Sequence, residues 1–216
     1  YKTATLGRWF TVFKADNKVD WAKDENGYIT LDTVYGIAPN PQVTVSGGEI
    51  TYTYYKAVLS DGQFTKTEKL NAWSTTDCGA GLYCCVVTVA ESDNYKEATA
   101  ERFFTVRKAE NEITYKTNEK GDILGLDFVY GNGPIEDTAI SKAGALTYTY
   151  TLVNKDSTGD PVEPAADAVY APWSDANISG IYKCKIVAAE TDNYTSVTSY
   201  RWVRVHKADN TIEWAK

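Results

Sequence analysis

The sequence predicts an all-β protein made of tandem immunoglobulin-like β-sandwich domains. Three observations support this: Tyr, Val and Thr are abundant while Met is absent, apolar residues alternate with polar ones, and the pattern recurs after about 95 residues. No long stretch carries apolar residues at the spacing of an amphipathic helix. A β-grasp repeat is the alternative fold, and it requires a helix that the sequence does not indicate.

The repeat is clearest around one short motif. The segments "FTVFKADNKVDWAK" from Phe10, "FTVRKAENEITYK" from Phe104 and "VRVHKADNTIEWAK" from Val203 align without gaps. Other stretches keep the same register, among them "GLYCCVVTVAESDNY" and "GIYKCKIVAAETDNY". Because a regular period of this length is typical of domain arrays, we expect two tandem domains.

The alignment also sets the expected domain boundaries. These are 1–14 as the closing strand of a preceding repeat, 15–108 and 109–207 as immunoglobulin-like repeats, and 208–216 as the first strand of a following repeat. A second phase, with units at 1–94 and 95–193, fits the repeat as well. Since unpaired strands present open backbone groups, we expect both end segments to dock on the adjacent domain or to pair with another molecule.

Within each repeat the expected strands alternate and are separated by turn residues. In "GLYCCVVTVA" the alternation places Tyr83, Cys85, Val87 and Val89 on one face, and "ESDNY" then supplies Asp and Asn for a hairpin turn. About seven short strands in each repeat are typical of an immunoglobulin-like sandwich. The Gly-x-Tyr-x-Cys motif, which includes Tyr83 and recurs around Tyr182, matches the tyrosine-corner position of such domains.

The order of these motifs carries a family resemblance. Val-Tyr-Gly, Thr-Tyr-Thr-Tyr, Gly-x-Tyr and Glu-(Ser/Thr)-Asp-Asn-Tyr, closing on Phe-Thr-Val-x-Lys-Ala-(Asp/Glu)-Asn, resemble the tandem immunoglobulin-like repeats of large bacterial cell-surface proteins, especially those of Gram-positive gut commensals. The resemblance covers essentially the whole chain. It implies an extracellular adhesin module, with its anchor and export signal outside this fragment.

The same resemblance implies what such a module does. It would bind host glycoprotein, with mucin or immunoglobulin as the candidate partners, or display a distal binding domain. Because repeats of this kind also serve as spacers, a passive structural stalk is the first alternative. An accessory carbohydrate-binding module of a secreted glycosidase is the second.

The charge excludes several classes of partner. The net charge is -7 and the isoelectric point is near 4.8, so the chain would repel nucleic acids and anionic membrane surfaces. No apolar run approaches the length needed to cross a bilayer, so we expect no membrane insertion. Neighbouring repeats of the same chain are expected partners.

The sequence offers no chemistry typical of an enzyme, a metal site or a cofactor site. His206 is the single histidine, so no second histidine can share a metal ion or complete a catalytic triad. The carboxylates of the "ESDNY" and "ETDNY" segments are expected at hairpin tips, where turn formation explains them. We expect no catalytic residue, no metal and no cofactor.

Four cysteines are present and contain no Cys-x-x-Cys pair. Alternation directs Cys85 and Cys184 inward at equivalent repeat positions, where a thiol behaves as a small apolar group. Cys84 should face outward, and Cys78 precedes it across a turn. A local disulfide between Cys78 and Cys84 is therefore possible in an exported protein, and two unlinked thiols are the alternative.

The candidate ligand-binding residues are aromatic. One group shares a single repeat position, opposite the inward face of the last strand: Trp9, Phe103 and Trp202. A second group comprises an outward residue of an earlier strand and two residues in the irregular segment before the Gly-x-Tyr strand: Tyr55, Trp73 and Trp173.

The recurring aromatic position has two interpretations. Exposed Trp and Tyr side chains dominate protein interfaces and stack on sugars, which favours a binding face. Packing of the same side chains on the linker or on the neighbouring repeat would instead stiffen the array. The segments before the Gly-x-Tyr strand differ sharply between the two repeats, and variable segments on a common framework are typical places for ligand contacts.

Overall fold

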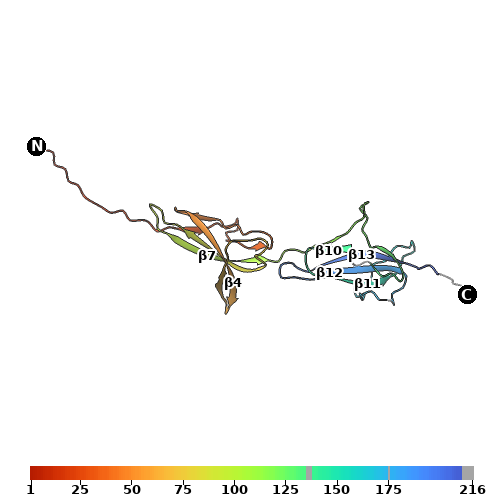
Figure 1. The fold of residues 1–216 in the computed structure, drawn as a ribbon. Coiled ribbons are helices and arrows are strands. Elements are labelled where there is room, and N and C mark those ends of the chain that lie inside the picture. Colours follow the sequence, from red (N-terminus) through yellow and green to blue (C-terminus); the bar gives the residue numbers. More distant parts are fainter. Residues whose placement is uncertain (135–137, 175, 211–216) are drawn as a thin grey trace. The chain divides into compact units, whose positions relative to one another are not determined.

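The computed structural model describes residues 1–134, 138–174 and 176–210. The chain divides into two compact units, Tyr1–Lys108 and Ala109–Lys216, each with its own core (Figure 1). In each unit a large sheet and a two-stranded sheet enclose that core, so the predicted all-β sandwich class is confirmed. The described residues contain no α-helix, which the β-grasp alternative requires.

The first unit contains seven strands within the described residues. They are β1 (Val19–Trp21), β2 (Thr33–Val34), β3 (Val43–Val45), β4 (Ile50–Ser60), β5 (Gln63–Lys69), β6 (Gly81–Val89) and β7 (Ala98–Arg107). The large sheet has the order β2-β7-β6-β4-β5, and β1 pairs with β3 in the small sheet. All of these pairings are antiparallel except that of β2 with β7.

The second unit repeats this arrangement with one strand fewer among its described residues. Its strands are β8 (Ile113–Tyr115), β9 (Asp127–Val129), β10 (Ala139–Ser141), β11 (Leu146–Val153), β12 (Gly180–Ala188) and β13 (Val197–His206). The large sheet has the order β11-β12-β13-β9, and β8 pairs with β10. None of the described segments forms a helix with the length and apolar character needed to span a lipid bilayer.

The cores confirm the predicted alternation. Tyr83, Cys85, Val87 and Val89 of β6 are at most 4% exposed. Residues of the small sheet pack against them from the other side, and these are Val19, Trp21, Val43 and Val45. Each large apolar side chain buried in this way contributes about 1.5–3 kcal/mol to folding, so the two facing sheets are the main source of stability.

The tyrosine corner is confirmed in both units. The Tyr83 hydroxyl donates to the carbonyl of Gly79 at 2.8 Å, and the Tyr182 hydroxyl donates to the carbonyl of Ile178 at 2.9 Å. The Tyr182 hydroxyl also accepts a hydrogen bond from the N–H of Ile178 at 3.0 Å. Each tyrosine therefore fixes the loop that precedes its strand.

The recurring Lys-Ala-(Asp/Glu)-Asn motif lies at the start of each unit. Ala15 pairs with the hairpin tip of the first unit, where its N–H donates to the carbonyl of Asn94 and its carbonyl accepts from Lys96, both at 2.9 Å. Ala109 makes the equivalent bonds to Asn193 and Thr195, at 2.9 and 3.0 Å. The motif is thus tied to the same hairpin in both units.

The segment 1–14 is mostly exposed, and its last residue, Lys14, forms an ion pair with Glu91 of the first unit. Residues 1–14 form no strand, and the side chains of Trp9 and Phe10 are 103% and 86% exposed. Apart from the Lys14 ion pair, the expected docking on the adjacent domain is not seen for this segment, and its pairing with another molecule, the alternative expectation, stays a prediction. The aligned strand β7 lies between β2 and β6, whereas no described strand pairs with residues 1–14. Of the other end segment, 211–216 lie outside the described residues.

Candidate functional site

The outer face of the first unit's large sheet brings two of the predicted residues together. Cys84 of β6 is paired with Tyr55 of β4 on one side and with Phe103 of β7 on the other. Phe104, the next residue of β7, is 3% exposed in the core, so Phe103 points to the outer face as predicted. Tyr55 and Phe103 thus flank Cys84.

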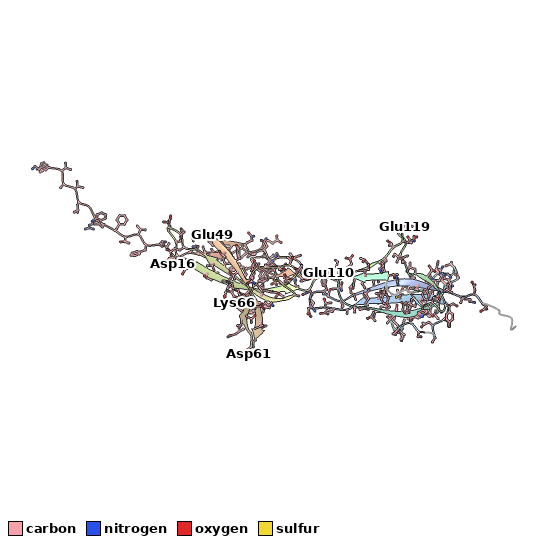
Figure 2. All side chains as sticks on the ribbon, in the orientation of Figure 1. Asp16, Glu49, Asp61, Lys66, Glu110 and Glu119 are labelled. Carbon is pink, nitrogen blue, oxygen red and sulfur yellow. The ribbon has the colours of Figure 1, made fainter. Side chains whose placement is uncertain are left out.

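A two-stranded arm extends from this sheet. The pairing of β4 with β6 ends at Lys56, and beyond it residues 57–60 pair with β5 as the only described strand. Asp61 and Gly62 have φ angles of 52° and 76°, as in a two-residue type I′ hairpin turn. We call residues 57–66 the arm; Figure 1 shows the end of β4 leaving the sheet, and Figure 2 places Asp61 at the tip.

Two side chains of β5, those of Phe64 and Lys66, reach over the outer face. The ring of Phe64 stacks on that of Phe103, with centroids 5.2 Å apart and planes 24° apart. Lys66 forms an ion pair with Glu101 of β7, and its ammonium group lies 5.6 Å from the centroid of the Tyr55 ring. These contacts lie above Cys84 and close it off from solvent.

This cover overturns the expectation for Cys84. Alternation gave the correct face of the strand, but Cys84 is 0% exposed instead of facing solvent. Cys78 is also buried, against the core, and neither residue forms the possible disulfide. Burial raises the pKa of the Cys84 thiol to about 11, and the nearby Glu101 carboxylate adds to this shift.

The outer part of the arm remains exposed. The exposed fractions of Val58, Leu59 and Phe64 are 48%, 58% and 50%. Leu59 and Phe64 are paired directly across the two strands, so they lie on one face. This face of the arm continues through Phe103 to Tyr55 as an aromatic and aliphatic strip.

The outer face of the second unit is covered differently. Lys183 of β12 lies between two aromatic residues of β13, with its ammonium group 5.2 Å from the ring centroids of both Tyr200 and Trp202. Its ion-pair partner is Glu163, which belongs to the segment between β11 and β12. From the same segment, Tyr170 packs edge-on against Tyr200 at 6.2 Å.

Phe103 and Trp202 are therefore on the predicted face but only partly exposed. Phe103 is covered by Phe64 of the arm, whereas Trp202 is contacted by Lys183, whose ion-pair partner Glu163 belongs to the variable segment. Neither interpretation of the recurring aromatic position included such contacts within one unit. Trp202 still lines a surface hollow of about 310 Å³ with Pro161 of that segment. Trp9 lies on no strand, so it is not placed with the other two.

Trp73 and Trp173 belong to the cores instead of forming exposed binding platforms. Trp73 packs against Tyr83 and Phe104 at 5.1 and 5.7 Å between ring centroids. Trp173 packs in the same manner against Tyr182, at 5.1 Å. Trp173 also lines a hollow of about 340 Å³ with Tyr130 and with neutral polar residues that include Asn132, Ser174 and Asn177.

The single histidine lies at the surface. His206 Nε2 is 2.9 Å from Asp127 Oδ1, and both side chains are more than half exposed. Among the residues that the structure describes, no group of three or more His, Cys, Asp or Glu side chains is arranged to hold a metal ion.

Sequence reasoning missed Phe64 and Lys183, which carry the contacts on the two outer faces. The Asp-Gly dipeptide at residues 61–62 is a strong hairpin signal and could have located the arm. The position of Lys183 between two rings has no such signal, because it depends on how a distant segment folds back.

Comparisons with known proteins give the following findings. No family model and no curated protein matches the chain. Among solved structures, mouse cadherin-23 EC22-24 is similar with a TM-score of 0.34 and 12% identity, covering 90% of this chain and 68% of that one. Human mucin-like protocadherin EC1-2 is similar with a TM-score of 0.25 and 12% identity, covering 88% and 99%.

Proposed function

We propose that the chain is a non-enzymatic repeat module of a bacterial cell-surface protein, in which a common β-sandwich framework presents a different surface segment in each unit. One observation carries this proposal. Between two equivalent strands, the first unit carries a projecting arm, whereas the second carries a segment that folds over its own sheet. A fixed framework with divergent segments at one location is suited to contacts that differ from repeat to repeat.

The arm is the proposed contact region for host glycoprotein, with mucin or immunoglobulin as the candidate partners. Leu59 and Phe64 form an exposed apolar pair on one face of the arm, and Val58 is exposed on the opposite face, so the arm presents apolar surface of the kind that binding proteins use. The resemblance to surface repeats of gut bacteria supports the extracellular location and these partners. The alternative in that family is a passive stalk, which would bind neither.

A non-catalytic role is supported by the chemistry at the surface. The single histidine is engaged with Asp127 at an exposed strand end. The buried thiols lie under side chains, and burial raises the pKa of Cys84 and Cys85 to about 11 and about 12. Since a nucleophilic cysteine needs a lowered pKa and access to substrate, these residues are suited to packing.

The connection between the two units is short, which suits a module that displays a distal binding domain. The carbonyl of Arg107 accepts a hydrogen bond from Tyr35 within the first unit, and the N–H of Ala109 donates to Asn193 within the second. Only Lys108 lies between these two anchored residues. Because flexible linkers are longer and rich in Gly or Ser, we propose that this connection limits independent motion of the two units.

Binding is tested by pull-down of purified mucin and of immunoglobulin on the immobilised chain. The key variant replaces residues 59–64 by a two-residue Asn-Gly turn, which removes Leu59 and Phe64 and lets the hydrogen-bonded pair Val58–Thr65 close the shorter hairpin. We expect retention by the parent chain and loss in the variant. A matched control shortens the second unit's segment at residues 156–160. Equal retention by all three chains would refute the arm as the contact region, and retention by none would favour the stalk.

A second candidate function rests on the hollow beside Trp173. Its described lining residues combine aromatic rings with amide and hydroxyl groups, and none of these described residues is charged, which suits a neutral sugar. In the first unit the corresponding Tyr35 donates to the Thr76 carbonyl at 3.3 Å instead. Tyr130→Ala should abolish signals on a glycan array, whereas Tyr35→Ala should not. An array without signals for the parent chain would rule out this candidate.

A further inference from the structure

We propose that the arm is a self-association element, through which two copies of this chain pair β5 against β5 as antiparallel edge strands. The inference does not depend on the proposed host ligand. It rests on the open backbone edge of β5, on the side chains along that edge and on the distribution of charge.

The backbone of β5 is available for pairing. Among the described strands, β5 lies at the edge of its sheet and pairs only with β4. All seven of its residues are exposed. A two-stranded ribbon that leaves its sheet is marginally stable by itself, so the arm would gain from a further strand.

The hairpin geometry identifies which backbone groups point outward. In a type I′ turn at Asp61 and Gly62, Ser60 and Gln63 form the hydrogen-bonded pair that closes the turn. Antiparallel pairs alternate, so the next pair, Leu59 with Phe64, is not hydrogen-bonded. By the same alternation, the N–H and C=O groups of Phe64 and Lys66 point away from β4 and toward the open edge.

These outward groups define one symmetric register. If Thr65 of one copy faces Thr65 of the other, Phe64 of each copy lies opposite Lys66 of the other. Each such pair exchanges two N–H···O=C bonds, which gives four bonds about a two-fold axis. Thr–Thr pairs are among the favourable cross-strand neighbours, and the Lys66 stem would cover the exposed Phe64 ring of the other copy.

The usual protection of an edge strand is weakened here. A lysine on an edge normally prevents association, because its charge would have to be buried. Lys66 is already paired with Glu101 and lies over the Tyr55 ring. The register shift that could twist the edge away lies between Tyr55 and Ala57, at the base of the arm, and residues 57–66 contain no proline.

Charge favours the arm over other surfaces for this contact. The whole chain carries a net charge of -7, so two copies repel each other over most of their surface. Residues 57–66 contain one Asp and one Lys, and their net charge is zero. The arm therefore offers an apolar and uncharged approach between two acidic molecules, and this favours a second copy of the chain as its partner.

The register is tested by cysteine cross-linking of the full chain. In the proposed dimer the two Thr65 residues face each other in a non-hydrogen-bonded pair, within the Cα separation that a disulfide requires. Thr65→Cys should give a disulfide-linked dimer under mild oxidation. Gln63→Cys is the matched control, since it lies on the same face of β5 but would be about 13 Å from its symmetry mate. The native cysteines are buried and should not interfere.

The contribution of the backbone hydrogen bonds to dimerisation is tested by sedimentation equilibrium. Lys66→Pro removes one outward N–H and the Glu101 ion pair, whereas Lys66→Ala removes the ion pair alone. We expect Lys66→Pro to weaken dimerisation at least about tenfold more than Lys66→Ala, because two of the four intermolecular bonds are lost. Amide exchange at β6 and β7 checks that the sheet is intact in both variants.

Three outcomes would overturn the proposal. One is a parent chain that stays monomeric at millimolar concentration. Another is cross-linking of Gln63→Cys as fast as that of Thr65→Cys, which would indicate collision without register. The last is equal dimerisation of Lys66→Pro and Lys66→Ala, which would exclude strand pairing at this edge.

Discussion

Asn111 and Ala143 are joined by hydrogen bonds in both directions. The Asn111 Nδ2 atom donates to the Ala143 carbonyl at 2.8 Å, and the Ala143 N–H donates to Asn111 Oδ1 at 3.3 Å. In the first unit Asn17 has the same role, since it donates to Gly47 and accepts from Ser46. The asparagine of the recurring motif thus ties the start of each unit to the turn before its long strand, β4 or β11.

A glycine follows each clamped residue, and it explains why the turn has the same conformation in both units. Gly48 and Gly144 have φ angles of +102° and +81°. A Cβ atom added at either glycine would lie 2.1 Å from a backbone carbonyl oxygen, that of Ala90 or Ala189. No other residue fits there without a shift of the backbone. The glycine therefore keeps the turn in the conformation that the asparagine binds.

The first prediction concerns this clamp. Asn111 is 8% exposed, so Asn111→Ala would leave the partly buried N–H and carbonyl of Ala143 without their partner. We expect a loss of about 2 kcal/mol in the free energy of unfolding, measured by urea denaturation of the full chain. Asn154→Ala, at an exposed position, should change stability by less than about 0.5 kcal/mol. Equal effects of the two substitutions would contradict the role of the clamp.

The second prediction concerns the cysteines. Titration with a thiol reagent in denaturant should find four thiols per chain, because the structure contains no disulfide. In the folded protein at pH 8, Cys84 and Cys85 should stay unmodified, since both are 0% exposed and burial raises the pKa of each thiol. A count of two thiols in denaturant would restore the Cys78–Cys84 disulfide.

The third prediction concerns alkaline stability. Burial is the main cause that raises the pKa of Cys85 from 9.0 to about 12. Above pH 9 the unfolded chain therefore releases this proton while the folded chain keeps it, so stability should fall as pH rises from 9 to 12. Cys85→Ala should flatten the decline by up to about 1.4 kcal/mol per pH unit, as followed by urea denaturation.

A core substitution without a titrating group provides the control for this pH dependence. Val87 is also 0% exposed and lies on the same face of β6, so Val87→Ala creates a cavity without removing a titrating group. Its stability curve should lie below that of the parent chain and keep the same slope. If both variants keep the parent slope, the Cys85 thiol does not account for the alkaline decline.

The fourth prediction concerns Lys183. Replacing it by Met keeps the apolar stem but removes the contacts of the ammonium group with Tyr200, Trp202 and Glu163. We expect a loss of about 1–2 kcal/mol and faster chymotryptic cleavage near Tyr170. Lys185→Met, on the same strand face, is the control. Identical cleavage rates for the two variants would show that Lys183 does not hold the covering segment.

Much of the framework follows from the sequence because it depends on local patterns. Alternation correctly placed Tyr83 and Cys85 in the core, and the Gly-x-Tyr motif correctly predicted the tyrosine corner. The short strands β2 and β9 were not predicted, although "LDTVYG" and "LDFVYG" recur. Two or three residues are too few to show alternation, and both strands pair in parallel with strands distant in sequence.

The outer faces were harder to predict for a different physical reason. Alternation assigns a side chain to a face but says nothing about what covers that face. Cys84 was therefore expected at the surface, whereas Phe103, Lys66 and their partners bury it. The covering segments have different sequences and different folds in the two units, so the repeat could not predict one from the other.

The register shift between Tyr55 and Ala57 divides β4 into a part that belongs to the sandwich and a part that belongs to the arm. Up to Tyr55, β4 is held in the sandwich by its hydrogen bonds to β6. Beyond Ala57 it projects from the sheet, and the length of this projecting part does not change which side chains of β6 and β7 face the core. The register shift thus marks the position where the hairpin can change without a change in the sandwich. We expect that hairpins of other lengths can be grafted between Tyr55 and Lys69 while the sandwich keeps its fold.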